Sequence, residues 1–437
     1  MVMRRSLLGI LSLMVLAGCD SEKPPLEGKR LAVVEYQSRV KIDPEAAKYG
    51  VTLPAMESVP AWGQLGANSS HVMPHADLGA SPKVMWTSSL GSGNSSSSRV
   101  LSTPIAVDGK VYGMDSRGFV SAIESSSGSR LWQVDVSPEG TRGFSIFGGG
   151  SLGGGVAYEA GLLFVTTPYA EVLALNPENG EVKWRTKTSS PVRAAPTVQD
   201  GKIYVVSINN QLDVFESATG KKLWSHAGIT EHAGLLGTAS PAVSQGVVIV
   251  TYSSGEIFAL KVENGHELWS ETLSSSRRPD SLSNISHIRA LPVISGNLVL
   301  IVGHHQKMGA FDLRSGQKVW ERQVGGLQTP VVAGDFIYLL SQHNELIALT
   351  KDHGLVAWIT PLPRDEKKPH RIMWAGPILA GEKLYLVGQK GELKAFDPKT
   401  GQERSSQDIG GRFALPPIVS QSVLYLLGEN GTVTAIH

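Results

Sequence analysis

The side chain best suited to covalent chemistry is the thiol of Cys19, the only cysteine among the 437 residues. A single thiol cannot form an intramolecular disulfide, and proteins of oxidising compartments usually carry cysteines in pairs or not at all. Cys19 directly follows roughly a dozen apolar or small residues, LLGILSLMVLAG, and precedes any part of the chain that could build a core. This position favours a reaction at the sulfur over a role in packing.

The residues before Cys19 have the layout of a secretion signal. Arg4 and Arg5 supply the positive region, and the apolar run is too short to span a bilayer as a stable helix. The stretch Leu16-Ala17-Gly18-Cys19 resembles the lipobox of bacterial lipoproteins, in which the cysteine receives a diacylglycerol and becomes the new N-terminus. The resemblance implies a lipid anchor at Cys19, since several acyl chains hold a protein to a membrane firmly. The alternative is a cleaved signal with a chance cysteine.

Other groups that could do chemistry are sparse. His304 and His305 are adjacent, so in a strand they point to opposite faces and cannot bind one metal ion together. Ser315 and Lys318 have the Ser-x-x-Lys spacing of acyl-transfer sites, but they straddle a turn. The glycine-rich stretch 147–155 lacks the Gly-Lys-Ser/Thr ending of a phosphate loop. We therefore expect no catalytic residue, no metal site and no cofactor.

Composition narrows the class of protein. Without Arg4 and Arg5, 38 basic residues stand against 39 acidic ones, so nothing in the charge balance attracts nucleic acid. The 48 glycines and 24 prolines, together with many Val, Ile, Leu, Tyr and Trp, indicate short strands joined by tight turns. No later stretch approaches the roughly 18 apolar residues of a transmembrane helix.

The elements that must position any functional residue come from an internal repeat with a period near 45 residues. Its pattern is A-x-[DNE]-x-x-x-G-x-x-x-W, as in ALNPENGEVKW (174–184). A proline-led apolar strand, as in APTVQDG (195–201), precedes most copies. The repeat glycines are Gly128, Gly180, Gly220, Gly265, Gly316, Gly354 and Gly401, and the tryptophans are Trp132, Trp184, Trp224, Trp269, Trp320 and Trp358.

Each copy predicts one blade of a β-propeller. Residues 202–224 alternate between apolar and polar positions over short runs separated by turn residues, which predicts three strands. The repeat glycine supplies the positive φ of a tight hairpin. The tryptophan carries more apolar surface than one small sheet can cover, so a neighbouring blade must cover it. With the proline-led strand, each unit has four antiparallel strands.

The two ends of the chain predict how the ring closes. Residues 415–437 supply three strands and end before any tryptophan strand, while residues 83–91 supply a lone strand with Trp86 in register. Pairing these ends completes an all-β, eight-bladed propeller and removes an open sheet edge. The predicted division is a signal peptide at 1–18, a lipidated tether and pre-propeller segment at 19–83, and the propeller at 84–437.

The repeat pattern resembles the PQQ-like repeat of quinoprotein dehydrogenases and related propellers that bind no quinone. Together with the lipobox, the chain is similar to the BamB family, lipoprotein partners of BamA in the outer-membrane β-barrel assembly machinery. This resemblance implies a non-catalytic scaffold that binds a BamA-like barrel protein, other machinery components and unfolded outer-membrane protein clients. It also implies a position at the periplasmic face of the outer membrane. Asp20, directly after the anchor cysteine, resembles an inner-membrane retention signal of some enteric bacteria and leaves that location as the alternative.

The resemblance also implies contact residues for the partner. Two neighbouring inter-blade loops of the family carry a Leu-Arg pair and two aspartates. Val192 and Arg193 align with the first pair, whereas His287 and Arg289 occupy the acidic positions, which reverses the charge. An arginine that only caps a blade junction is the alternative for Arg193.

Two other functions remain open at this point. One is a lipoprotein that binds a small ligand or cell-wall component in the central channel. The other is a divergent quinoprotein dehydrogenase, although such enzymes usually carry a vicinal cysteine pair and an acidic Ca²⁺ site, and this chain has no second cysteine.

Overall fold

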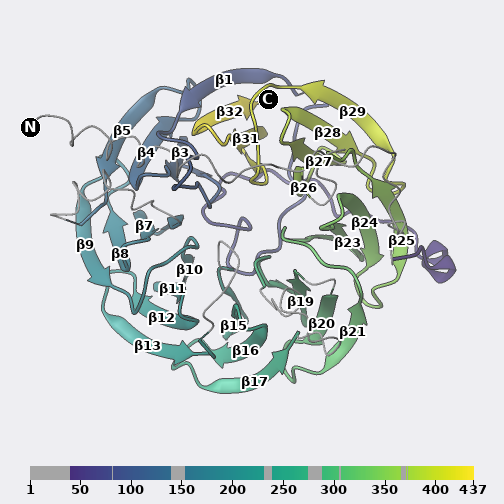
Figure 1. The fold of residues 1–437 in the computed structure, drawn as a ribbon, viewed down its shortest axis with the longest axis horizontal. Helices are drawn as coiled ribbons and strands as arrows, with labels where there is room; N and C mark the ends of the chain where they lie inside the picture. Colours follow the sequence, from purple (N-terminus) through teal and green to yellow (C-terminus); the bar gives the residue numbers. More distant parts are fainter. Residues whose placement is uncertain are drawn as a thin grey trace, which may run out of the picture. The chain divides into compact units, whose positions relative to one another are not determined.

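The described part of the chain is built almost entirely of β-strands. The computed structural model describes residues 40–80, 82–138, 153–230, 239–273, 288–304, 307–365, 371 and 373–437. Apart from a short 3-10 helix, η1 (Pro44–Lys48), the regular elements of these ranges are strands grouped into eight four-stranded sheets. Figure 1 shows the sheets as blades around a ring, each with one strand on the outer rim. The eight-bladed propeller predicted from the repeat is confirmed.

The strands of each blade follow in sequence from the innermost to the outermost, except in the blade that contains both ends of the ring. The first four blades are β2 (Ile105–Val107), β3 (Lys110–Met114), β4 (Phe119–Glu124) and β5 (Arg130–Asp135); β6 (Gly155–Glu159), β7 (Leu162–Thr167), β8 (Glu171–Leu175) and β9 (Val182–Lys187); β10 (Thr197–Gln199), β11 (Lys202–Ser207), β12 (Gln211–Glu216) and β13 (Lys222–Ala227); and β14 (Ala242–Ser244), β15 (Val247–Thr251), β16 (Glu256–Lys261) and β17 (Glu267–Thr272).

The next three are β18 (Val293–Ser295), β19 (Leu298–Gly303), β20 (Lys307–Asp312) and β21 (Lys318–Arg322); β22 (Val331–Ala333), β23 (Phe336–Leu340), β24 (Glu345–Thr350) and β25 (Val356–Pro361); and β26 (Trp374–Ala380), β27 (Lys383–Gly388), β28 (Glu392–Phe396) and β29 (Glu403–Asp408). The closing blade has the order β30 (Ile418–Ser420), β31 (Val423–Leu427), β32 (Thr432–Ile436) and β1 (Val84–Ser89).

Seven junctions between blades share one contact, a tryptophan packed on the glycine turn of the next blade. Each indole N–H donates a hydrogen bond of 2.8–3.1 Å to the carbonyl of the residue three before that glycine. Each glycine has a φ of 62–75°, and a Cβ built on it would lie 2.5–2.8 Å from the indole. The turn thus requires glycine for its conformation and for the space the ring occupies. The pairs are Trp86–Gly128, Trp132–Gly180, Trp184–Gly220, Trp224–Gly265, Trp269–Gly316, Trp320–Gly354 and Trp358–Gly401.

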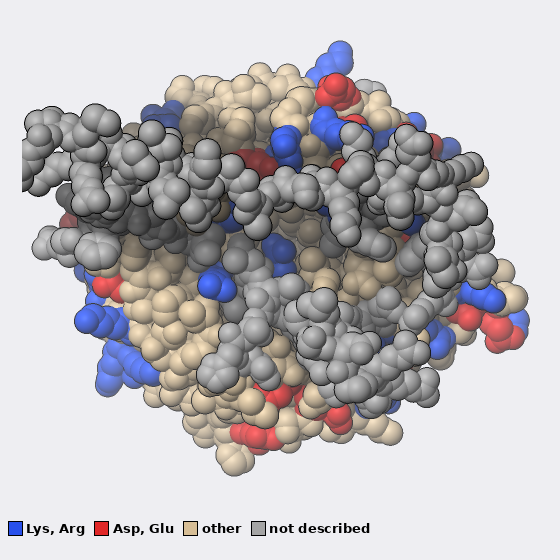
Figure 2. Space-filling view, in the orientation of Figure 1, with Lys and Arg blue, Asp and Glu red and all other residues tan. Residues whose placement is uncertain are grey.

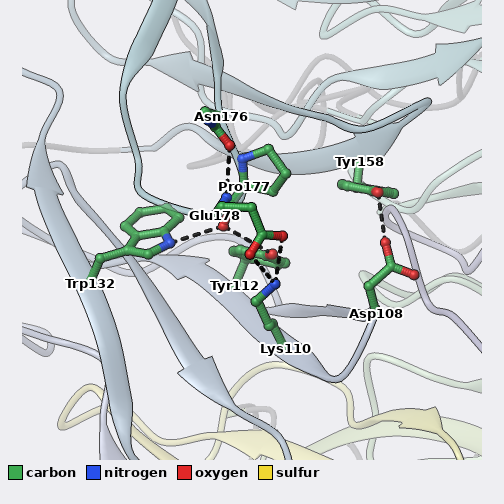
Figure 3. Close-up of polar contacts among 8 residues, drawn as sticks. All are labelled: Asp108, Lys110, Tyr112, Trp132, Tyr158, Asn176, Pro177 and Glu178. Atoms are coloured by element: carbon green, nitrogen blue, oxygen red, sulfur yellow. Dashed lines mark hydrogen bonds and ion pairs between the residues drawn. The ribbon is translucent and has the colours of Figure 1, made fainter.

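Figure 3 shows one of these junctions, between the β2–β5 and β6–β9 blades. The Pro177 carbonyl accepts hydrogen bonds from the Trp132 indole at 2.9 Å and from the Tyr112 hydroxyl at 3.2 Å. Beside them, the Lys110 ammonium contacts the Glu178 carboxylate at 2.7 Å. One carbonyl therefore receives donors from two strands of the neighbouring blade, which fixes the angle at which the blades meet.

The junction between the β26–β29 blade and the closing blade lacks this contact. Ser405 occupies the tryptophan position, opposite Ala395. The following blade has no glycine turn there, because its third and fourth strands, β32 and β1, come from opposite ends of the propeller sequence. Lys83 and His437 join them with two backbone hydrogen bonds of 2.9 Å. The tryptophan is therefore missing where no glycine turn exists to receive it.

Residues 57–77, named here the axial segment, cross the middle of the ring (purple-blue in Figure 1). They precede the first blade strand in the sequence, yet they hydrogen-bond to the inner parts of seven blades in order around the ring. The carbonyl oxygens of Val59, Gly63, Ser69 and Ser70 accept from the backbone N–H groups of Gln421, Tyr158, Val243 and Ile294, at 2.7, 2.7, 2.7 and 2.9 Å. Trp62 and Ala106 exchange two backbone hydrogen bonds (2.7 and 3.0 Å), and Ala76 donates to Leu379 O (3.2 Å) and accepts from Gly381 N (2.9 Å). The Gln64 side chain accepts from Val198 N (2.9 Å) and donates to Val198 O (3.2 Å).

The axial segment provides partners for backbone groups at the inner edge of the blades. Such groups would cost free energy if they were buried without a partner, because water could not reach them. The segment is also part of the core, since Trp62 is only 2% exposed and Val59 and Ala76 belong to the largest apolar cluster. The ring is therefore filled at its axis by a segment from outside the repeat.

The Trp–Gly contact predicts the effect of adding one methyl group. Gly220→Ala places a Cβ 2.5 Å from the Trp184 ring at a φ of +72°. Gly246→Ala is the matched control, because its φ is +76° and nothing lies within 4 Å of the added Cβ. The strain of positive φ costs both variants about 1–2 kcal/mol, and the steric overlap costs Gly220→Ala about 1–3 kcal/mol more. Urea unfolding should show this difference, and equal midpoints for the two variants would contradict the contact.

The axial segment also predicts a dependence of stability on pH. The His71 ring is fully buried with its Nδ1 2.7 Å from the Pro292 carbonyl, so Nδ1 carries the proton of the neutral ring. Burial lowers the pKa of His71 to about 4, below the ordinary value of 6.5. Because the folded pKa is depressed, the neutral His71 ring makes its full contribution to the free energy of unfolding above pH 6.5. This contribution, about 3 kcal/mol, is lost as the pH falls toward 4.

The test compares the wild type with His71→Asn, because asparagine tolerates the φ of +61° at this position. The variant should lose about 3 kcal/mol less stability than the wild type between pH 7 and pH 4, measured by urea unfolding. Parallel losses in the two proteins would show that His71 does not titrate in this range.

Candidate binding surfaces at the ring axis and the rim

A cavity lies beside the axial segment at the centre of the ring, and we name it the axial cavity. Its volume is about 100 Å³. Trp62, Leu65 and Met73 of the axial segment line one side, and residues that lead into the innermost strands, Arg193 and Arg289 among them, line the rest. Figure 2 shows Lys and Arg side chains near the middle of this face. Closure of the ring thus brings together two arginines that the sequence assigned to separate loops.

Arg193 and Arg289 have similar surroundings. Both are half-buried, and within the described ranges neither guanidinium group makes a hydrogen bond or an ion pair. Burial lowers the pKa of Arg289, which indicates that its charge is poorly solvated. Gly153 permits the loop of Arg193 to approach, because a Cβ on Gly153 would lie 2.5 Å from the Arg193 Cα.

Val192 does not have the exposure that a contact residue needs. Its side chain is completely buried and packs with Phe164, Val198 and Val205. Its backbone bridges to Ser207 across the blade junction. The expectation that Val192 offers an aliphatic side chain to a partner is therefore wrong for the protein alone; the residue instead fixes the loop that presents Arg193.

Two other predicted residues, Cys19 and His287, lie outside the described residues. The same holds for His305, the neighbour of His304. Among the described residues, no group of three or more His, Cys, Asp or Glu side chains is placed to hold a metal ion. No helix in the described ranges has the length and apolar character needed to cross a membrane.

Ser315 lies in the turn before β21, and Lys318 is the first residue of that strand. The Ser315 hydroxyl donates to Asp312 Oδ1 at 2.9 Å, and Lys318 Nζ pairs with Glu321 at 3.0 Å. The two side chains are thus engaged with separate carboxylates, as a turn and a strand surface require.

Trp62 lines the axial cavity, although the sequence pattern did not mark it as a functional residue. Trp62 Nε1 is buried and has no hydrogen-bond partner among the described residues. All seven tryptophans of the blade junctions use this atom to bind a carbonyl, so Trp62 is distinct from them. Its position outside the repeat was the only sequence signal that could have singled it out.

The outer rim offers a second kind of surface. Five outermost strands expose the aliphatic residue directly before the tryptophan, with 40–48% of each residue accessible. The residue is the extra one of a β-bulge, which turns the tryptophan toward the next blade. These residues are Met85, Leu131, Leu223, Leu268 and Val319. The outer edge of each of these strands pairs with no other described strand.

The comparisons with known proteins agree with this architecture. A family model described as outer membrane protein assembly factor BamB matches residues 116–360 and 366–437. The outer membrane protein assembly factor BamB of Yersinia pestis is 28% identical over 364 residues, which cover 83% of this chain and 91% of the relative.

Solved structures show the same fold. The crystal structure of BamB from Moraxella catarrhalis superposes with a TM-score of 0.66 at 16% identity, covering 82% of this chain and 98% of that one. A quinohemoprotein alcohol dehydrogenase from Comamonas testosteroni gives a TM-score of 0.65 at 14% identity, covering 86% and 80%. These likenesses show the fold alone, because one ring architecture serves different activities. The family follows from the sequence match over most of the repeat: the chain belongs to the outer membrane protein assembly factor BamB family.

Proposed function

We propose that the protein is a non-catalytic lipoprotein scaffold of the outer-membrane β-barrel assembly machinery, which binds a BamA-like barrel component and aids insertion of outer-membrane proteins. The observation that carries this proposal is membership of the BamB family across the propeller. The presence of one cysteine in the whole sequence argues against the quinoprotein alternative, which usually has a vicinal cysteine pair. The scaffold would act through its surfaces, without making or breaking bonds.

The anchor of this scaffold would be diacylglycerol on Cys19. The lipobox-like Leu16-Ala17-Gly18-Cys19 supports it, and the residues up to the described region would tether the ring to the periplasmic face of the outer membrane. Asp20 keeps inner-membrane retention as the alternative.

The partner contact would use the loops that carry Arg193 and Arg289. The two guanidinium groups lack an acidic partner among the described residues, so an acidic surface on the BamA-like protein would complement them. His287, two residues before Arg289 in the sequence, would belong to the same contact. This arrangement replaces the aspartates expected at the second loop with cationic or neutral groups and requires the opposite charge on the partner.

Unfolded clients would bind at the outer rim. An exposed strand edge can pair with an extended segment through backbone hydrogen bonds, and the bulged aliphatic residues would contact apolar client side chains. The bulge interrupts pairing at the start of each strand, so the residues that follow the tryptophan would form the pairing edge. The BamA-like partner and the clients would then occupy different parts of the ring.

The anchor can be tested by changing its nucleophile. Cys19→Ala removes the thiol, so cell fractionation should find the protein as a soluble form or an unprocessed precursor. The wild type should remain with the outer membrane. Metabolic labelling with a fatty acid should mark the wild type alone. Unchanged membrane association of the variant would remove the anchor from the proposal.

The partner contact can be tested by in-cell crosslinking from a photoreactive residue at Ser189, which is exposed in the same loop as Arg193. The same probe at exposed Lys221, in the hairpin turn of the next blade, is the matched control. The Ser189 probe should capture the BamA-like protein, and Arg193→Glu should reduce the yield about tenfold through charge repulsion. Equal capture from both sites, or none from Ser189 in a folded, lipidated protein, would contradict this interface.

A further inference from the structure

Three residues that line the axial cavity have side-chain donors without a hydrogen-bond partner among the described residues. Trp62, only 2% exposed, has an indole N–H without a partner in the described parts of the chain. Arg193 and Arg289 line the same cavity and also have no partner there. Buried donors are normally paired, and leaving one unpaired costs free energy. One buried indole N–H and two half-buried guanidinium groups, none of them paired with a described residue, point to a ligand that accepts hydrogen bonds.

The charge of the cavity specifies that ligand further. Among the described residues that line it, two are cationic and none is acidic. A half-buried guanidinium without a counter-ion is unfavourable. An anion offsets the desolvation cost of the two charged groups only if it also forms hydrogen bonds of good geometry. A carboxylate does both, because its two oxygens accept from a guanidinium fork and from a neutral N–H.

The remaining wall fixes the size and character of the rest of the ligand. Leu101, Leu291, Leu327 and Leu415 line the cavity, and Met73 of the axial segment lies against it. The volume of about 100 Å³ is somewhat smaller than the apolar cavity of about 150 Å³ that binds benzene in another protein. One compact apolar group therefore fits, and a large fused-ring cofactor does not.

We propose that the axial cavity binds a carboxylate that carries one compact apolar group. Arg193 and Arg289 bind the carboxylate, the Trp62 indole N–H donates to it, and the leucines enclose the apolar group. The C-terminal residue of a polypeptide and a short-chain fatty acid are two sources of this chemistry. The site does not depend on the lipid anchor, but it uses the two arginines assigned above to the BamA-like contact, so ligand and partner would compete for them.

The axial segment forms one side of this site and hydrogen-bonds to seven blades across the centre of the ring. The other lining residues lead into, or begin, the innermost strands. A ring without this segment would have neither Trp62 nor the apolar floor formed by Leu65 and Met73. The ligand site therefore depends on a part of the chain that does not belong to the repeat.

Isothermal titration calorimetry on the purified full-length protein, in a non-ionic detergent at constant concentration, tests the proposal. The probes are N-acetyl-phenylalanine, its C-terminal amide, and hexanoate. By the usual affinity per ligand atom, N-acetyl-phenylalanine should bind with a Kd on the order of 0.5 mM, and the amide at least about tenfold more weakly. Binding of N-acetyl-phenylalanine without hexanoate assigns the site to polypeptide termini, and the reverse result assigns it to fatty acids. Mutual competition shows that both sources use one site.

Three variants connect the binding to the cavity. Arg289→Gln and Arg193→Gln should each weaken carboxylate binding by about tenfold, and Trp62→Phe, which removes the N–H and keeps an aromatic ring, by about fivefold. Arg117→Gln is the matched control, because Arg117 is exposed and does not line the cavity. Circular dichroism checks that each variant is folded. Equal affinity for acid and amide, equal affinity in Arg289→Gln and Arg117→Gln, or no saturable binding by either acid would overturn the proposal.

Discussion

The structure depends above all on the contact between a tryptophan and the glycine turn of the next blade. A four-stranded blade has two broad faces and cannot bury both by itself, so its stability comes from its neighbours. The indole supplies a large apolar surface and one directional hydrogen bond, and the glycine leaves the space and conformation that this contact needs. Repetition of this contact at seven of the eight junctions holds neighbouring blades together.

Ring closure uses strand pairing in place of the tryptophan–glycine contact. Where the two ends of the propeller sequence meet, the strand pair β32–β1 replaces a hairpin, and Ser405 replaces the tryptophan. Backbone pairing between Lys83 and His437 takes over the role of the missing turn. The closing blade thus joins the ring without the tryptophan–glycine contact that joins the others. Its β32 strand is paired on both sides, with β31 and with β1.

The proposed binding surfaces lie where the repeat is broken. The axial segment belongs to no blade, yet it fills the centre of the ring and contributes Trp62, whose N–H binds no carbonyl of the described residues. The loop with Arg289 departs from the charge expected of its family, and it converges with the loop of Arg193 on the same cavity. On the rim, the bulge that turns each tryptophan inward leaves an aliphatic residue exposed to solvent. A regular scaffold and its irregular additions therefore have separate roles, as in other propellers that support many activities.

The sequence by itself determined the blades, because their signals are local: the glycine at a positive φ, the tryptophan four residues later and the alternating strands lie within a short stretch. It also determined that residues 83–91 would complete the last blade, since three strands at one end of the propeller sequence and a lone strand at the other together make one four-stranded blade. It could not place the axial segment, which lacks periodicity and is ordered by hydrogen bonds and apolar contacts with blades far along the chain. Nor could it show that Val192 is buried while Arg193 faces the cavity, because neighbouring loop residues have no fixed alternation. Only the closed tertiary structure decides this, since it brings Trp62, Arg193 and Arg289 together at the axis.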